Sequence, residues 1–71
     1  MIPRDWAFFG EVGLSGEIRP VQGGLERINE AHKHGFSTVV VPKANAPANL
    51  STAISVIPVA SISELHEILS F

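Results

Sequence analysis

Three histidines, at positions 32, 34 and 66, are the side chains here that most readily bind a metal or move a proton near neutral pH. His32 and His34 lie two residues apart on a predicted helix, so their side chains diverge, whereas residues that meet on a helix are three or four apart. His66 falls on another predicted helix, and the chain contains no cysteine. The sequence therefore predicts no metal site, and it favours surface histidines, with His34 as a cation at a helix C-terminus.

Hydroxyl and carboxylate groups offer little more chemistry. Ser15 and Ser37 could act as nucleophiles, but no base neighbours them, and turn or cap chemistry explains both. Glu11 and Glu17 flank a predicted tight turn and could converge as a carboxylate pair, although exposed glutamates on hairpins are more often solvating groups. These patterns predict no catalytic residue.

The basic residues are spread along the chain with acidic residues between them, and the formal net charge is −2. Solvated surface is one interpretation of this spacing. The other is a sparse DNA-binding site, because a ring of subunits can turn a few cations per chain into a basic channel around a phosphate backbone. The candidate DNA-binding residues under that hypothesis are Arg19, Arg27, Lys33 and Lys43.

The first third of the chain predicts a β-hairpin. Residues 6–9 form an apolar strand, and residues 10–14, in which Val12 and Leu14 alternate with Glu11 and glycine, can continue it. Ser15 and Gly16 make the expected two-residue turn. Residues 17–21 then return antiparallel, and Pro20 confines this strand to an edge or ends it.

The remaining elements alternate. A helix is expected over residues 25–34, with Leu25, Ile28 and Ala31 or His32 on its buried face and Gly35 as its left-handed cap. Residues 38–41, ended by Pro42, have the β-branched pattern of a central strand. A loop with one helical turn at Pro47, a strand over residues 54–59 and a last helix capped by Ser61 and Glu64 follow, with a buried stripe of Ile62, Leu65, Ile68 and Leu69.

The predicted fold class is therefore α/β (α+β): hairpin, helix, strand, loop, strand, helix, with a mixed sheet and both helices on one face. The 71 residues are 45% hydrophobic and 17% charged, which is typical of one small core-forming domain. No apolar run approaches the roughly 20 residues of a membrane span, so no membrane contact is expected and a cytoplasmic setting is the default.

Three blocks in order, GEVGLSGEIRPV, GLERINEAHKHGF and VVVPKANAP, resemble the second half of the C-terminal Lon-protease-like domain of the bacterial RadA/Sms DNA repair family. The resemblance runs from about Ile2 to the end. It implies a fold of the Lon-protease-like (ribosomal protein S5 domain 2-like) type, of which residues 1–71 are a single C-terminal fragment.

The resemblance also implies partners. RadA/Sms proteins carry a zinc-binding segment, a RecA-like ATPase core and the first half of this domain ahead of the matching region. ATP, magnesium and zinc are thus implied for the parent protein, with no cofactor in this fragment. The implied role is a non-catalytic module that packs on the other half of its own domain, supports a homo-oligomer, expected to be a hexamer, and contacts DNA.

Glu26 bears on whether the fragment is an enzyme. In proteolytic Lon-like domains the run similar to Gly23-Gly24-Leu25 continues with a catalytic lysine, and a carboxylate cannot replace an amine that activates a serine. The matching serine would precede residue 1. The alternatives are a fragment of a Lon-type ATP-dependent serine peptidase, a magnesium-chelatase-like competence protein domain, or a small protein-interaction domain unrelated to DNA.

Overall fold

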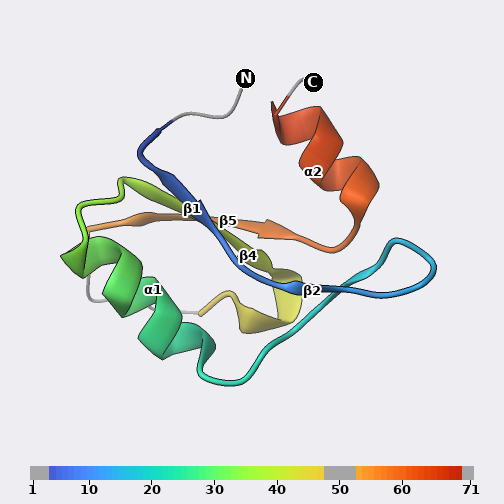
Figure 1. The fold of residues 1–71 in the computed structure, drawn as a ribbon, viewed down its shortest axis with the longest axis horizontal. Coiled ribbons are helices and arrows are strands. Elements are labelled where there is room, and N and C mark those ends of the chain that lie inside the picture. Colours follow the sequence, from blue (N-terminus) through green and yellow to red (C-terminus); the bar gives the residue numbers. More distant parts are fainter. Residues whose placement is uncertain (1–3, 48–52, 70–71) are drawn as a thin grey trace.

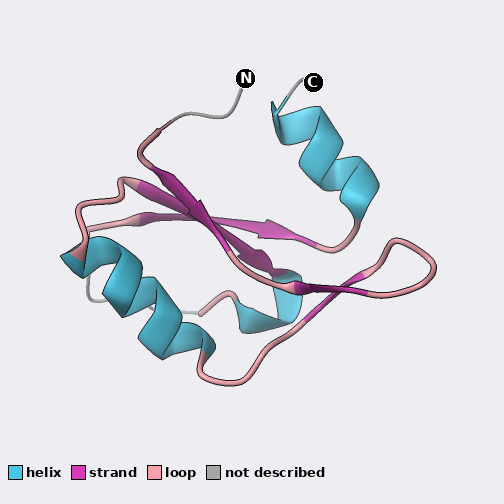
Figure 2. Ribbon diagram, viewed as in Figure 1, coloured by secondary structure: helices cyan, strands magenta, loops and turns pink. Residues whose placement is uncertain are grey.

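The computed structural model describes residues 4–47 and 53–69, which form two sheets and two α-helices (Figure 1, Figure 2). A three-stranded sheet has the order β1-β4-β5, and a separate two-stranded sheet pairs β2 with β3. The elements in chain order are β1 (Trp6–Phe8), β2 (Glu11–Val12), β3 (Ile18–Arg19), α1 (Gly24–Lys33), β4 (Thr38–Pro42), the 3-10 helix η1 (Lys43–Asn45), β5 (Ser55–Val59) and α2 (Ile62–Leu69).

Strand β4 is the centre of the larger sheet, as its β-branched sequence predicts. It pairs in parallel with β1 on one side and with β5 on the other, and all five of its residues are buried. On one face of the sheet, Val39 and Val41 pack with Ile28 and Ala31 of α1 and with Ile54. Ile28, Val39 and Val41 have no exposed surface, so this face holds the main core.

The two helices lie on opposite faces of the sheet, which corrects the expected arrangement on one face (Figure 1). Alternate side chains of a strand point to opposite faces. Val39 faces α1, whereas Val40 lines a groove together with Leu65 and Ile62 of α2. The predicted α/β (α+β) class is confirmed. The parallel and antiparallel pairings fall in two separate sheets, because the larger sheet is wholly parallel and β2-β3 forms the other.

Helix α1 ends in the cap that its sequence predicts. Gly35 has φ +87°, and the N–H groups of Gly35 and Phe36 donate to the carbonyls of His32 and Ala31. This pair of bonds is the Schellman motif, which satisfies carbonyls that the helix leaves free. The buried face is narrower than expected, since Ile28 and Ala31 are buried but Leu25 is 54% exposed and His32 is exposed.

Helix α2 begins at the expected cap. The Ser61 hydroxyl accepts the N–H of Glu64, and the Glu64 carboxylate accepts the N–H of Ala60. In the predicted buried stripe only Leu69 is fully buried, while Leu65 and Ile68 are half-buried and Ile62 is 41% exposed.

The chain between β4 and β5 differs from the expected loop. The helical turn is η1, at Lys43–Asn45, directly after β4, and Pro47 has no helical conformation. The rest of the predicted loop, residues 48–52, lies outside the described residues.

Candidate functional site

The first turn of α1 holds Glu26, at the position where the resemblance places a lysine in peptidases. Gly23, in the left-handed conformation with φ 70°, turns the chain into the helix, and Glu26 follows as the acidic residue of the first turn. The side chain is exposed. A carboxylate near a helix N-terminus interacts favourably with the helix dipole, so Glu26 fits its place as a structural residue.

The Asn45 side chain holds the segment that leads into this turn. Its Oδ1 accepts the N–H of Val21 at 2.8 Å, and its Nδ2 donates to the carbonyl of Val21 at 3.0 Å. The Asn45 amide lies so close to Gly24 that a Cβ at residue 24 would come within 2.6 Å of Nδ2. Asn45 therefore fixes the entry of α1, and glycine at 24 leaves the room for it.

The β2-β3 hairpin ends in a three-residue loop, not the expected two-residue turn. The N–H of Gly16 donates to the carbonyl of Gly13, the N–H of Gly13 donates to the carbonyl of Glu17, and Gly16 has φ +80°. This is the arrangement of a tight turn followed by a left-handed glycine. We call residues 13–17 the hairpin tip.

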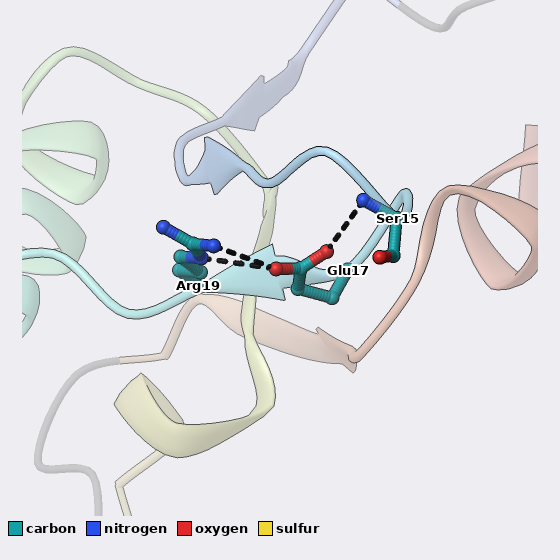
Figure 3. Close-up of polar contacts among 3 residues, drawn as sticks. All are labelled: Ser15, Glu17 and Arg19. Atoms are coloured by element: carbon teal, nitrogen blue, oxygen red, sulfur yellow. Dashed lines mark hydrogen bonds and ion pairs between the residues drawn. The ribbon is translucent and has the colours of Figure 1, made fainter.

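The Glu17 carboxylate organises the hairpin tip (Figure 3). It accepts the N–H of Ser15 at 3.0 Å and two bonds from the Arg19 guanidinium, at 2.8 and 3.1 Å. The pKa of the Glu17 carboxyl lies below its ordinary value, because its own backbone N–H, then Arg19 and Ser15, favour the charged form. Glu17 thus binds Arg19, and the two glutamates of the hairpin do not form the carboxylate pair considered from the sequence, because Glu11 pairs with Arg19 in the register of the strands.

The hairpin is also attached to the start of α2. The N–H of Ile18 donates to the carbonyl of Ala60, and the N–H of Ile62 donates to the carbonyl of Gly16, both at 2.9 Å. An isolated antiparallel bridge joins Glu17 to Ser61 between them. Strand β3 is therefore held from both sides, by β2 and by the segment that enters α2.

Two of the four candidate DNA-binding residues already have partners in the chain. Arg19 forms the ion pair with Glu17. Arg27 lies with its guanidinium 5.9 Å from the centre of the Phe9 ring, and its Nε donates to the carbonyl of Gln22 at 3.4 Å. Both side chains remain exposed, but a phosphate would have to compete with these contacts.

Lys33 and Lys43 are the other two candidates, and both are exposed. Within residues 4–47 and 53–69, neither forms an ion pair. Arg27 and Lys33 are six residues apart on α1, which separates their side chains by roughly 120° around the helix axis. The structure does not bring the four cations together into one patch on a single helix face.

The two candidate nucleophiles form hydrogen bonds that stabilise turns, as the sequence predicts. Ser15 donates its backbone N–H to Glu17, and the Ser37 hydroxyl donates to the carboxylate of Asp5, which joins the turn before β1 to the turn before β4. Among the described residues, no group of three histidine, cysteine or acidic side chains is placed to hold a metal ion. None of the helices in this part of the chain is long and apolar enough to cross a membrane.

Two grooves lie on opposite faces of the larger sheet. The α1 groove, a cleft of about 530 Å³, runs between α1 and the edge strand β1. Phe9 and Phe36 lie in it, and its polar side is lined by Glu26, Arg27, Glu30 and His34. The hairpin groove, of about 230 Å³, lies between the hairpin, the sheet and α2. Its lining is wholly uncharged: Phe8, Phe9, Gly10, Val12, Ile18, Val40, Val59, Ile62 and Leu65.

The sheet has two edges of different character. Phe9 donates its N–H to β4, so the backbone groups of Trp6 and Phe8 point away from β4, along an edge with which no strand of residues 4–47 and 53–69 pairs. At the other edge Ser55 donates to Ser37, so Val56 and Pro58 point outward. Proline has no N–H to donate, which blunts the β5 edge and leaves β1 as the edge that can accept a strand.

Sequence reasoning missed Asn45 and the role of Gly13. Asn45 stands in a stretch that reads as an ordinary loop, and its partner is 24 residues away. Gly13 has no left-handed φ; it is glycine because a Cβ there would overlap the Glu17 carboxylate. The sequence signal for Asn45 is an asparagine three residues after Pro42, which ends a strand. Asparagine is so common in loops that this pattern does not predict a specific side-chain contact.

Comparison with known proteins assigns the family. A family model described as subunit ChlI of Mg-chelatase matches residues 2–45, more than half of the chain. DNA repair proteins RadA from Pseudomonas aeruginosa and Escherichia coli are each 49% identical to it over 63 residues, which is 89% of this chain and 14% of each relative. A Lon protease from Chloroflexus aggregans is 36% identical over 73 residues, or 94% of this chain and 9% of the protease.

These matches agree with the expected resemblance, which rests on the hairpin, α1 and β4 blocks. The chain spans only 14% of the length of the two RadA relatives. The chain therefore belongs to the family that the ChlI model describes, within the group of Lon-protease-like sequences that includes the DNA repair proteins RadA.

Proposed function

We propose that this chain is a non-catalytic module of a RadA-type, ATP-dependent DNA repair protein. Its role is to complete a Lon-protease-like domain, to support assembly of a homo-oligomeric ring, and to contact DNA. ATP, magnesium and zinc belong to other regions of the parent protein under this proposal. The relatives named RadA support the repair context.

The observation that carries the non-catalytic part is Glu26 in the first turn of α1. A serine nucleophile needs a base that can take its proton, and a lysine amine does so once its pKa is lowered. Glu26 supplies no such amine, and its exposed side chain stands in the first turn of α1. A peptidase is the second candidate, because a Lon protease is among the relatives.

The open edge of β1 supports pairing with the preceding half of the same domain. Trp6 and Phe8 present outward backbone groups, and Phe8 is 38% exposed beside them. An unpaired edge with aromatic side chains is an aggregation hazard unless another strand covers it. The β5 edge, blunted by Pro58, does not offer the same site.

Hydrogen exchange measured residue by residue tests this pairing. In the isolated chain, we expect the amides of Trp6 and Phe8 to exchange rapidly, and in the intact parent protein to become protected. The Val56 amide, which points outward from β5, is the matched control and should gain no protection. Protection of Val56 with continued exchange at Phe8 would place the partner strand at the wrong edge and refute the proposal.

DNA contact is assigned to Arg19, Arg27, Lys33 and Lys43. Because Arg19 and Arg27 have partners within the chain, the larger effects are expected at Lys33 and Lys43. Each phosphate contact that is lost should lower the slope of log K against log salt by about 0.7 to 0.9. The measurement is DNA binding by the intact parent at several salt concentrations, with each cation changed to glutamine. If all four variants kept the parent's affinity and salt slope, the DNA role would be wrong.

A further inference from the structure

The apolar residues left exposed by this fold gather around the hairpin. Five large hydrophobic side chains are exposed among residues 4–47 and 53–69, and four of them belong to the hairpin or its groove: Phe8 (38%), Val12 (59%), Leu14 (106%) and Ile62 (41%). The fifth, Leu25, stands on α1. Single exposed leucines are ordinary, but a contiguous apolar patch marks an interaction surface.

Leu14 belongs to the hairpin tip, which is bonded to the start of α2. Its side chain is as exposed as in an extended chain, so it fills no groove of its own molecule. Figure 1 shows the loop between β2 and β3 extending away from the sheet. The backbone that carries Leu14 is nonetheless fixed, since the Glu17 carboxylate holds Ser15 and the Gly16 carbonyl is bonded to α2. A partner that covers Leu14 therefore does not have to order the backbone that carries it.

The hairpin groove is a cavity that could hold an apolar side chain. It offers about 230 Å³ between the hairpin, Val40 of the sheet and Leu65 of α2, with no charged residue in its lining. The hairpin tip is neutral as well, because its one charged side chain, Glu17, is paired with Arg19. Neutral apolar surfaces match each other and match neither a phosphate backbone nor a charged peptide.

We propose that Leu14 of one copy of this chain docks into the hairpin groove of a second copy. Each copy carries both the projecting leucine and the groove, and it cannot bring its own leucine into its own groove. Such a contact runs from one copy to the next, and when its rotation closes it produces a ring. The inference rests on the assembly role proposed above and names the contact that provides it.

Cysteine cross-linking tests the contact directly, because the chain has no cysteine of its own. The Leu14→Cys chain is mixed with the Ile62→Cys chain and oxidised, and the same mixture is made with Leu25→Cys as the control. We expect a disulfide-linked pair of Leu14→Cys with Ile62→Cys, since residue 62 lines the groove and docking would bring the two Cβ atoms within reach. Equal yields with Leu25→Cys, or no cross-link in either mixture, would overturn the proposal.

Sedimentation of the chain over a range of concentrations gives the second measurement. Leu14→Ser, which removes no internal contact, should weaken self-association by roughly tenfold or more, whereas Leu25→Ser should leave it unchanged. Unchanged association of Leu14→Ser would refute the docking. That result is separable from failure of the proposed function, because protection of the Trp6 and Phe8 amides in the intact parent does not depend on Leu14.

Discussion

The Asn45 side-chain amide pairs with both backbone groups of Val21, in the way that a neighbouring strand would. One side chain thereby joins η1 to the segment between the hairpin and α1. Both hydrogen bonds are partly buried, so losing them leaves a donor and an acceptor without a partner.

Asn45→Ala should lower the free energy of unfolding by about 1 to 3 kcal/mol, because the Val21 groups lose both bonds. Asn45→Asp keeps the acceptor but not the donor, so its free energy of unfolding should lie between those of the unchanged chain and Asn45→Ala. Urea unfolding measures both. Asn29→Ala on α1, a half-buried residue with no described side-chain hydrogen bond, is the control and should change stability by less than about 0.5 kcal/mol. Equal losses at 45 and 29 would contradict the clamp.

Ile28→Ala should destabilise the chain by about 2 to 5 kcal/mol, since Ile28 is fully buried between α1 and the sheet. That loss is a large share of the stability of a domain this small, so the variant should be largely unfolded at 37 °C by circular dichroism. Leu25→Ala, three residues away on the same helix and 54% exposed, should change stability by less than about 0.5 kcal/mol. Equal melting temperatures for the two variants would show that the core lies elsewhere.

Gly13→Ala should displace the Glu17 carboxylate, because the new Cβ would occupy its place. The Ser15 amide then loses its acceptor, and NMR should show its shift and faster exchange. Gly13→Ala combined with Glu17→Ala should be milder than the sum of the two single changes, since the clash is gone. Gly16→Ala is the contrasting variant. An alanine at residue 16 would be strained by the backbone φ of +80° and not by a clash, because its Cβ would meet no atom within 4 Å. Glu17→Ala should therefore not relieve the loss of stability. Additive effects for residues 13 and 17 would contradict this account.

The hairpin tip should loosen in acid. The pKa of Glu17 in the folded chain is below its ordinary value of 4.5, so its contribution is complete above 4.5 and is lost as pH falls through the folded value. The Ser15 amide should therefore lose protection only below about pH 4.5. Glu17→Gln should make the exchange of Ser15, corrected for its intrinsic rate, independent of pH in this window. A loss of protection that began near pH 6 would require a different group.

Glu26→Lys should produce no peptidase activity in the chain. The substitution supplies an amine at the expected position, but the Ser37 hydroxyl donates to Asp5 and Ser15 belongs to the hairpin tip. Stability should fall by less than about 1 kcal/mol, because a positive charge replaces a negative one in the first helical turn. Casein cleavage and thermal melting check the two parts, with Glu26→Gln as the control. Cleavage of casein by Glu26→Lys would contradict this prediction and support the peptidase hypothesis.

Local sequence signals predicted the parts of this fold that depend on neighbouring residues. Gly35 after a helix, the β-branched run of β4 and the Ser61–Glu64 cap are each decided within a few residues, and each is present. The family was likewise visible in three short blocks. These features needed no knowledge of how distant segments meet.

Non-local relations were the ones that sequence could not supply. The face that α2 covers depends on how β5 leads into it, and the need for glycine at residue 13 depends on the Glu17 carboxylate that occupies the place of a Cβ there. Arg19, a candidate DNA contact, forms an ion pair with Glu17, which is two residues away in the sequence. This ion pair forms because residues two apart on a strand have their side chains on the same face. Charge spacing alone does not reveal it.

Pro58, whose backbone faces outward from β5, allows a further strand to pair with the sheet at the β1 edge but hinders pairing at the β5 edge. A sheet with two receptive sides can add copies without end, as fibres do, whereas one that is closed on one side accepts a single neighbour and stops. Replacing this imino acid with valine would restore the missing donor and leave both sides receptive. One residue that lines neither groove thus limits strand addition to the β1 side of the sheet.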